Sequence, residues 1–266
     1  MVIDNRDNCN RGKMGSLSIC IIVLNESDKI RDCLENIRGL GDELIVVDQF
    51  SMDGTLDICK EYTDHVYQYL PTGGFADSRN YADSKARGEW IFWLDADERL
   101  DGQLKAEILS VLDTTSVHDA YYVQRINYIF GKWMLPERHI RLYRKCDSIW
   151  VGKVHESIRV VGSIGRLRHE IRHFSHPNIS TCMNKINLYS TLEAEQLFEK
   201  DPAGIGLLRL LYVTVESFLY KIIKINLLKD GIHGFIWVVL ASVYQFITRA
   251  KHWEMAYRAK CEINTR

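Results

Sequence analysis

The sequence lacks several features that would point to common protein classes. Its seven cysteines are odd in number and form no Cys-X-X-Cys pair, which argues against a disulfide framework or a structural zinc site and favours reduced cytoplasmic thiols. Its net charge of −1 offers no overall attraction for nucleic acid. The polar N-terminus, MVIDNRDNCNRGKMG, lacks the apolar stretch of a signal peptide. We therefore expect a cytoplasmic protein that does not bind nucleic acid.

The 266 residues are 46% hydrophobic and 26% charged, which suffices for one large domain with an extension. The charge is unevenly distributed, because residues 1–200 contain 25 basic and 30 acidic side chains whereas residues 201–266 contain 9 and 5. A basic, apolar tail behind an acidic body indicates contact with an anionic surface such as a membrane. We expect a lead-in at 1–16, an α/β domain at 17–180 and a helical extension at 181–266.

Short apolar runs alternate with helical patterns through the first hundred residues. The runs expected to form buried strands are 17–26, 42–48, 64–70 and 89–94. Four strand–helix cycles predict an α/β fold with a mostly parallel sheet flanked by helices. Downstream, helices are expected at 101–113 and 176–200, and strands at 120–130, 139–145 and 157–162.

Acidic and amide side chains follow three of the expected strands. Asn25 and Glu26 end the first strand, Asp48 ends the second, and Asp95 and Asp97 follow the run 89–94. An Asp-X-Asp motif on its own more often belongs to a loop that caps a helix than to a metal site. Ligands bind at the carboxyl ends of parallel strands, however, and these acids share that edge. The shared edge predicts a Mg²⁺ or Mn²⁺ site in which the cation also contacts phosphate oxygens.

Together these segments resemble a known family. SICIIVLNE, ELIVVDQFSMDGT, FADSRNYADSKARGEWIFWLDADERL and RLYRK are similar to the inverting family-two glycosyltransferases, which have the GT-A (Rossmann-like) fold. GKWMLPERHIRLYRK, VGKVHESI, RHFSH and the tail GFIWVVLASVYQFITRAKHWE resemble the bacterial lipopolysaccharide-core glycosyltransferases of the WaaE (KdtX) type. The likeness spans residues 17–254 and implies a nucleotide-diphosphate-sugar donor, favouring a UDP-sugar, and a divalent metal.

The resemblance implies a role for each matching residue. The residues that would bind the donor are Asn25, Glu26, Asp48, Asp53, Arg79 and Asp95. Asp48 would read the base or ribose, and Arg79 would lie near the base and diphosphate. Asp97 would be the direct metal ligand, whereas Asp95 would face the ribose or the metal. Phe50 and Met52 replace the small polar residues that the family usually places before Asp-Gly-Thr, which leaves the contacts of that loop open.

Inversion requires a carboxylate that takes the proton of the acceptor hydroxyl. Glu156, in KVHES, is the favoured catalytic base, and Glu137, in LPERH, is the alternative. Either could instead bind the acceptor or form a surface ion pair. Four histidines are clustered downstream: His155, His169, His173 and His176. In some enzymes of the resembled family a downstream histidine completes the metal shell, which implies this role for His173 in RHFSH. The alternative for His173 is a purely structural histidine.

Three arginines, Arg138, Arg141 and Arg144, recur with a period near three. They could hold the donor diphosphate or an anionic acceptor such as a phosphorylated core sugar. They could also be outward charges on a strand.

The tail contains two apolar segments, 207–228 and 232–248. The second has no Asp, Glu, Lys or Arg across 17 residues, which span about 25 Å as a helix and fall short of the roughly 30 Å hydrocarbon core. In the first, the charged residues fall on one arc of a helical wheel and leave an apolar face. This pattern favours helices in the membrane interface over a spanning helix. The alternative is a helical hairpin that packs on the body or on a second subunit.

We therefore expect an inverting glycosyltransferase at the cytoplasmic membrane that acts on lipopolysaccharide core or another lipid-linked glycan. Capsule or exopolysaccharide assembly is the next setting. A nucleotidyltransferase of the same fold would carry a glycine-rich loop after the first strand, where this chain has LNESDK. A non-catalytic membrane scaffold is the remaining alternative, and it would tolerate loss of Asp97 and Glu156.

Overall fold

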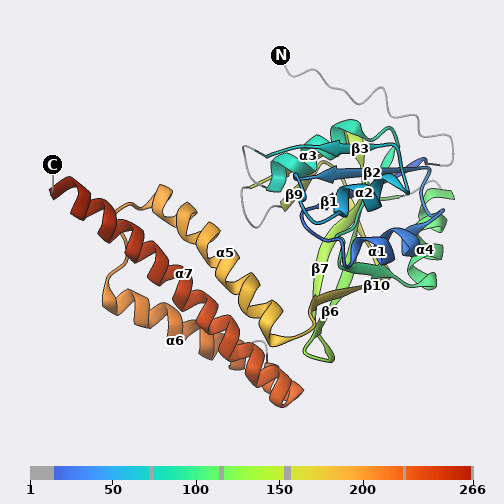
Figure 1. The fold of residues 1–266 in the computed structure, drawn as a ribbon. Coiled ribbons are helices and arrows are strands. Elements are labelled where there is room, and N and C mark those ends of the chain that lie inside the picture. The colour runs from blue at the N-terminus through green and yellow to red at the C-terminus, as the bar shows by residue number, and fades with distance from the viewer. Residues whose placement is uncertain (1–14, 72–74, 114–116, 153–156, 224–225, 265–266) are drawn as a thin grey trace. The chain divides into compact units, whose positions relative to one another are not determined.

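A computed structural model describes residues 15–71, 75–113, 117–152, 157–223 and 226–264. The chain divides into two compact units (Figure 1). The first runs to Asn127 and resumes over Leu135–Ser175, and the second comprises Tyr128–Met134 and the chain from His176 onwards. Each unit is described separately below.

An eight-stranded sheet of order β3-β2-β1-β4-β7-β6-β10-β5 forms the centre of the first unit. Its strands are β1 (Leu17–Val23), β2 (Glu43–Asp48), β3 (Val66–Gln68), β4 (Trp90–Trp93), β5 (Glu98–Leu100), β6 (Ala120–Ile129), β7 (Lys132–Arg144) and β10 (Ile164–His176). β1 pairs in parallel with β2 and β4, and β2 pairs in parallel with β3. β4 pairs antiparallel with β7, and β5 pairs antiparallel with β10. The predicted α/β fold is confirmed.

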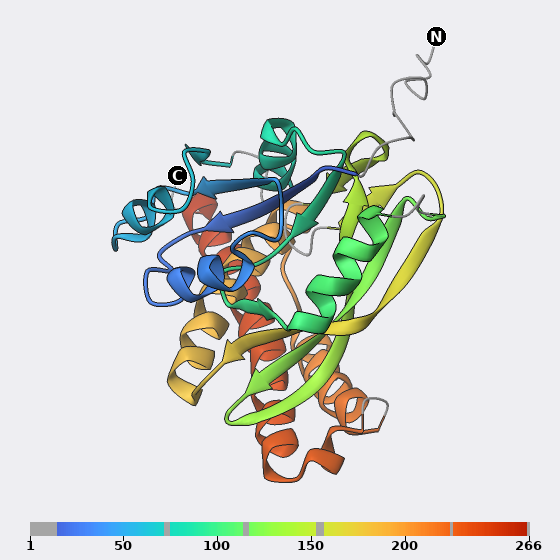
Figure 2. The ribbon, with the colours of Figure 1, turned by 90° about the vertical axis from the view of Figure 1, so that its right-hand side faces the viewer.

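Helices cover both faces of the parallel strands (Figures 1 and 2). They are α1 (Ile30–Ile37), α2 (Thr55–Lys60), α3 (Phe75–Lys85) and α4 (Gly102–Asp113). The apolar faces of α1 and α4 pack into one core cluster together with Leu17, Ile19 and Phe92. Alanines of α3 pack into a second cluster, with Ile91 and Trp93 from β4. β1 and β4 contribute to both clusters, and apart from Ser18 their residues are apolar, as expected of buried parallel strands.

A two-stranded hairpin of β8 (Ser148–Val151) and β9 (Ser157–Val160) lies beside α3. The side chain of Asn80 anchors it, because Asn80 Nδ2 donates to the carbonyl of Trp150 and Asn80 Oδ1 accepts from the Trp150 amide, each at 2.9 Å. Residues 153–156, which join the two strands, lie outside the described residues.

The second unit is helical and consists chiefly of α5 (Ile179–Lys200), α6 (Leu207–Ile223) and α7 (Ile232–Asn264). Helix α7 packs against both α5 and α6 (Figure 1). Asn178 caps the start of α5 by accepting from the Thr181 amide at 2.8 Å. Within the described residues, one helical stretch, Ile232–Cys261, has the length and composition needed to cross a membrane.

Candidate active site

The loops that follow β1 and β2 are joined by side chain to backbone hydrogen bonds. Asn25 adopts a left-handed backbone conformation (φ 54°), and its Oδ1 accepts from the Met52 amide at 2.8 Å. Asp53 accepts from the Ser27 amide at 3.1 Å and also binds Thr55. Desolvation opposes ionisation of Asp53, but the hydrogen bonds from Thr55 and Ser27 outweigh it and hold the pKa of this carboxyl well below its usual value. Asn25 and Asp53 thus shape the rim where the donor was predicted to bind.

Asp48 and Glu26 occupy the same rim. Asp48 is fully buried and accepts from the Ser51 amide and from Gln68 Nε2, the latter at 3.2 Å. Glu26 is half-buried and pairs with Lys29 at 2.6 Å. Asp48 therefore orders the turn at the end of β2. The nearby Phe50 adopts a φ of 62° and is exposed.

Asp95, directly after β4, is surrounded by arginines. Its carboxylate oxygens lie 2.9 Å from Arg141, 3.5 Å from Arg79 and 4.0 Å from Arg125. Burial opposes its charge, but Arg141 and Arg79 outweigh burial and hold the pKa of Asp95 well below its usual range. A carboxylate already paired with arginines is a weaker candidate for a metal ligand, so this geometry favours the ribose among its two expected roles.

Glu98, three residues after Asp95, is the buried centre of this cluster. It has no exposed surface, and its Oε1 accepts from Arg141 at 2.6 Å and lies 3.4 Å from Arg125. Its Oε2 accepts from the Asp95 amide at 3.0 Å. Sequence reasoning missed Arg125 altogether and left Arg141 among three interpretations. Neither lies near Glu98 in the sequence, so only the sheet register reveals their pairing.

Asp97 and His173 face each other, because β5 and β10 pair antiparallel with His173 opposite Glu98. His173 Nε2 lies 3.2 Å from Asp97 Oδ1, and both side chains are nearly buried. His173 Nδ1 lies 2.6 Å from Asn127 Oδ1. Asn127 Nδ2 donates to the carbonyl of Leu135, which fixes the amide and leaves its oxygen facing the imidazole.

This arrangement tests whether a divalent metal fits the site. Because Asn127 Oδ1 can only accept, His173 Nδ1 carries a hydrogen and, in the neutral ring, the lone pair of Nε2 points at Asp97. Two acceptors at this distance require a cation or a proton between them. Among the described residues, no group of three or more acidic, histidine or cysteine side chains could hold a metal unaided. Mg²⁺ and Mn²⁺ sites often combine few protein ligands with substrate phosphates, so the Asp97–His173 pair fits.

The two candidate bases differ in what the structure shows of them. Glu156 lies outside the described residues. Glu137 is paired with His139 at 3.3 Å and with Arg125. The hydrogen bond from His139 and the charge of Arg125 lower the pKa of Glu137 to about 2 despite partial burial. A carboxylate with so low a pKa is a weak proton acceptor near neutral pH.

The remaining candidate arginines and histidines, except Arg79, make their contacts away from the Asp95 cluster. Arg144 pairs with Glu89 and lies over the ring of Trp90, and Arg138 is exposed. His169 pairs with Glu107 at 2.9 Å. These residues do not contact the Asp95 cluster through any interaction found in the described residues. Arg79, by contrast, lies over two tryptophan rings beside Asp95.

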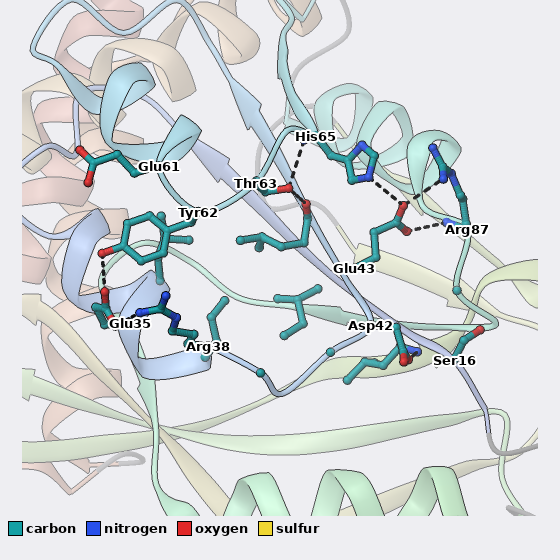
Figure 3. Close-up of a pocket in the computed structure, with 18 of the residues that line it drawn as sticks. Ser16, Glu35, Arg38, Asp42, Glu43, Glu61, Tyr62, Thr63, His65 and Arg87 are labelled. Carbon is teal, nitrogen blue, oxygen red and sulfur yellow. Dashed lines mark hydrogen bonds and ion pairs between the residues drawn. The ribbon is translucent and has the colours of Figure 1, made fainter.

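A hollow of about 730 Å³ lies at the opposite edge, where β1 and β2 begin (Figure 3). Its charged side chains pair with one another. Arg31 binds Glu61 at 2.7 Å. Glu43 lies between His65 and Arg87 (Figure 3). In α/β folds the ligand edge is the carboxyl end of the strands, so the hollow is not the candidate active site despite its size.

Comparison with known proteins identifies the family of this chain. Residues 18–179 match the family model described as glycosyl transferase family 2. Over 250 residues the chain is 31% identical to the lipopolysaccharide core biosynthesis glycosyltransferase LpsC of Rhizobium meliloti, covering 90% of this chain and 92% of LpsC. It is 26% identical to an uncharacterized glycosyltransferase of Rickettsia typhi, covering 93% and 90%. The crystal structure of S. aureus TarS with UDP-GlcNAc aligns with a TM-score of 0.46 and 13% identity over 92% of each chain. The chain belongs to the family-two glycosyltransferases.

Proposed function

We propose that this glycosyltransferase moves a sugar from a nucleotide-diphosphate sugar, preferably a UDP-sugar, to a lipopolysaccharide-core acceptor, with inversion. The likeness to LpsC over nearly the whole of both chains supports this acceptor class. Another surface glycan, such as capsule or exopolysaccharide, is the second candidate. The observation that carries the proposal is the Asp97–His173 pair, in which a carboxylate oxygen and an imidazole nitrogen face each other at 3.2 Å after β4 and would share a cation that also binds donor phosphates.

In this proposal separate residues of the chain bind the metal and the donor. Asp97 and His173 hold Mg²⁺ or Mn²⁺, and Asn127 fixes the imidazole. The bound cation would neutralise charge on the departing nucleoside diphosphate. Arg79 stands beside Asp95 and adds positive charge near the diphosphate, while Asp95 faces the ribose.

The nucleotide pocket lies along the rim formed after β1 and β2. Asn25, Glu26 and Asp53 line it, and the buried Asp48 reads the base or ribose. Glu156 is the proposed base that deprotonates the acceptor hydroxyl, which attacks the anomeric carbon opposite the departing nucleotide. The low pKa of Glu137 supports the choice of Glu156 over its rival.

We also propose that the second unit binds the cytoplasmic membrane surface peripherally, where a lipid-borne acceptor resides. On α6 an apolar stripe at helical spacing is exposed: Leu208, Leu211, Val215, Leu219 and Ile223. On the first half of α7 the exposed large hydrophobic side chains are Ile232, Phe235, Val239 and Phe246. Single exposed apolar residues are common, but a row of exposed apolar side chains along each of α6 and α7 indicates an interaction surface.

A bilayer is the occupant that this surface fits best. Arg209 and Lys229 are exposed on and near α6, and the chain from residue 201 carries four more basic than acidic residues. Tyr212 and Tyr220 flank the α6 stripe, as aromatic residues do at membrane interfaces. Basic charge beside exposed aliphatic side chains suits anionic lipid. A second copy of this chain that docked through the same basic surface would be less well matched in charge.

A thermal-shift screen tests the proposed chemistry. The full chain is heated with UDP-, GDP-, ADP- and TDP-sugars, each with Mn²⁺ and each with EDTA. We expect one nucleotide class, UDP-sugars, to raise the unfolding temperature with Mn²⁺ and to lose that effect with EDTA. The absence of a shift with every nucleotide would contradict the proposal and favour a scaffold of the same fold.

A further inference from the structure

Arg79, on α3, lies in a corner formed by two tryptophan rings. Its guanidinium carbon is 4.6 Å from the ring centroids of both Trp93 and Trp150. The two rings are 5.9 Å apart and inclined at 78°, so they present two different surfaces to the cation. Arg79 Nη2 lies 3.5 Å from Asp95 Oδ1. The corner therefore determines where the Arg79 charge stands relative to the acid at the end of β4.

A single hydroxyl group holds both rings. The indole N–H groups of Trp93 and Trp150 donate to Tyr143 Oη at 2.5 and 2.9 Å. Tyr143 donates in turn to Asp83 Oδ2 at 2.6 Å, and Trp93 also donates to Asp83 Oδ1 at 3.0 Å. Asp83 follows Arg79 by one turn of α3. The helix that carries the arginine thus also carries the carboxylate that orients its aromatic corner.

The hydrogen-bond network around Tyr143 is buried, so its polar groups are desolvated at a cost in free energy. The side chains of Tyr143 and Trp93 have no exposed surface. Burial raises the pKa of Asp83 to about 6 and the pKa of Tyr143 well above its usual value. Apolar residues could fill the same space without burying a carboxyl group and a hydroxyl. What they could not do is fix the rotation of two indole rings, which requires directed hydrogen bonds.

We propose that Asp83 and Tyr143 are positioning residues of the donor site. They fix the indoles of Trp93 and Trp150 and thereby hold Arg79 in place beside Asp95. Asp83 and Tyr143 act through Arg79 and do not themselves bind the donor. This inference rests on the proposed function in one respect, the role of Arg79 near the donor diphosphate.

A double-mutant cycle with UDP as the probe tests the coupling. Tyr143→Phe keeps the ring and removes the hydroxyl. By calorimetry with Mn²⁺, we expect it to weaken UDP binding by about tenfold in the wild-type background. In the Arg79→Lys background the same substitution should change UDP affinity by less than about twofold, because the group that it positions is already gone. For the donor found in the thermal-shift screen, KM should rise while kcat stays within about twofold.

Two further variants separate positioning from a loss of folding. Tyr62→Phe is the matched control, because its hydroxyl donates to Glu35 at 2.7 Å at the opposite edge of the sheet, and we expect wild-type UDP affinity. Asp83→Asn keeps the shape but removes one acceptor, and it should weaken UDP binding in the same direction as Tyr143→Phe. Unfolding temperatures of all variants are measured so that binding is compared where each is folded.

The possible failures are distinguishable. If Tyr143→Phe weakens UDP binding equally in both backgrounds, the hydroxyl acts independently of Arg79 and the coupling is overturned. A Tyr143→Phe variant with wild-type affinity, or with lower kcat at unchanged KM, overturns it as well. If Arg79→Lys itself binds UDP as the wild type does, the role of Arg79 in the proposed function fails, and the inference fails with it.

Discussion

Arg141 Nη2 donates to Glu98 Oε1 at 2.6 Å and to Asp95 Oδ2 at 2.9 Å, so one guanidinium bridges the two carboxylates that follow β4. Glu98 has no exposed surface, and the side chain of Arg141 is only 5% exposed. Glu98 also accepts from the Asp95 amide. The orientation of Asp95 therefore depends on Glu98, a residue that does not need to touch the donor.

Glu98→Gln should lower the free energy of unfolding by about 3 kcal/mol, because removing one partner leaves the buried arginines short of a counter-charge. Urea denaturation measures this. Glu254→Gln is the matched control, since Glu254 pairs with Arg258 on the surface of α7 at 2.5 Å, and its loss should cost less than about 0.5 kcal/mol. Equal stability of Glu98→Gln and the wild type would contradict the role given to this cluster.

The strands of the parallel half of the sheet could be predicted because each buried strand is a short run of apolar residues in the sequence. The expected strand at 42–48 is β2, Glu43–Asp48, and the expected helix at 101–113 is α4, Gly102–Asp113. Apolar runs and helical periodicity depend only on neighbouring residues, so a single sequence reveals them.

The antiparallel half was predicted less well. β5 and β10 were missed because Glu98–Leu100 is short and Ile164–His176 mixes charged and apolar residues. The Asp97–His173 contact was expected from the resemblance, but the partner that orients the imidazole, Asn127, lies 46 residues away and carries no local signal. The sheet register, which no local pattern fixes, brings such residues together.

The identity of the base is tested by two isosteric substitutions. Glu156→Gln should lower kcat by at least about 10²-fold while leaving UDP affinity unchanged, because it removes only the proton acceptor. Glu137→Gln should keep kcat within about fivefold, since His139 and Arg125 hold the pKa of Glu137 at about 2. Steady-state transfer rates decide between them, and the reverse order of effects would assign the base to Glu137.

Asp83 should make stability fall as pH rises. The groups around it are Tyr143 on β7, Arg79 on the same helix and Cys20 on β1, and burial raises its pKa from 3.8 to about 6. Between these values the folded chain retains a proton that the unfolded chain releases, so the contribution of Asp83 to stability is greatest below about pH 4 and is lost by about pH 6.

Relative to Asp83→Asn, the wild type should therefore lose about 2 kcal/mol of unfolding free energy between pH 4 and pH 7. Urea titrations of both proteins at several pH values measure the difference. Parallel pH profiles would show that Asp83 ionises in the folded chain as it does in the unfolded one.

Membrane contact through α6 is tested by vesicle flotation. Leu211→Glu combined with Leu219→Glu places two charges in the exposed apolar stripe, where the wild-type side chains are 51% and 47% exposed. We expect the full chain to float with vesicles that contain phosphatidylglycerol and the double variant to remain unbound. Val161→Glu is the control, an apolar side chain in the first unit that is even more exposed, and it should float normally. Flotation of the double variant would rule out this surface.

The central claim, that Asp97 and His173 hold a divalent cation beside the donor, is tested most directly by Mn²⁺ titration with UDP, followed by electron paramagnetic resonance. The wild type should bind one Mn²⁺ per chain, and Asp97→Asn and His173→Gln should each weaken binding by at least about tenfold. His169→Gln, which breaks the His169–Glu107 pair elsewhere in the sheet, should bind Mn²⁺ as the wild type does. Equal Mn²⁺ affinity in wild type, Asp97→Asn and His173→Gln would contradict the account.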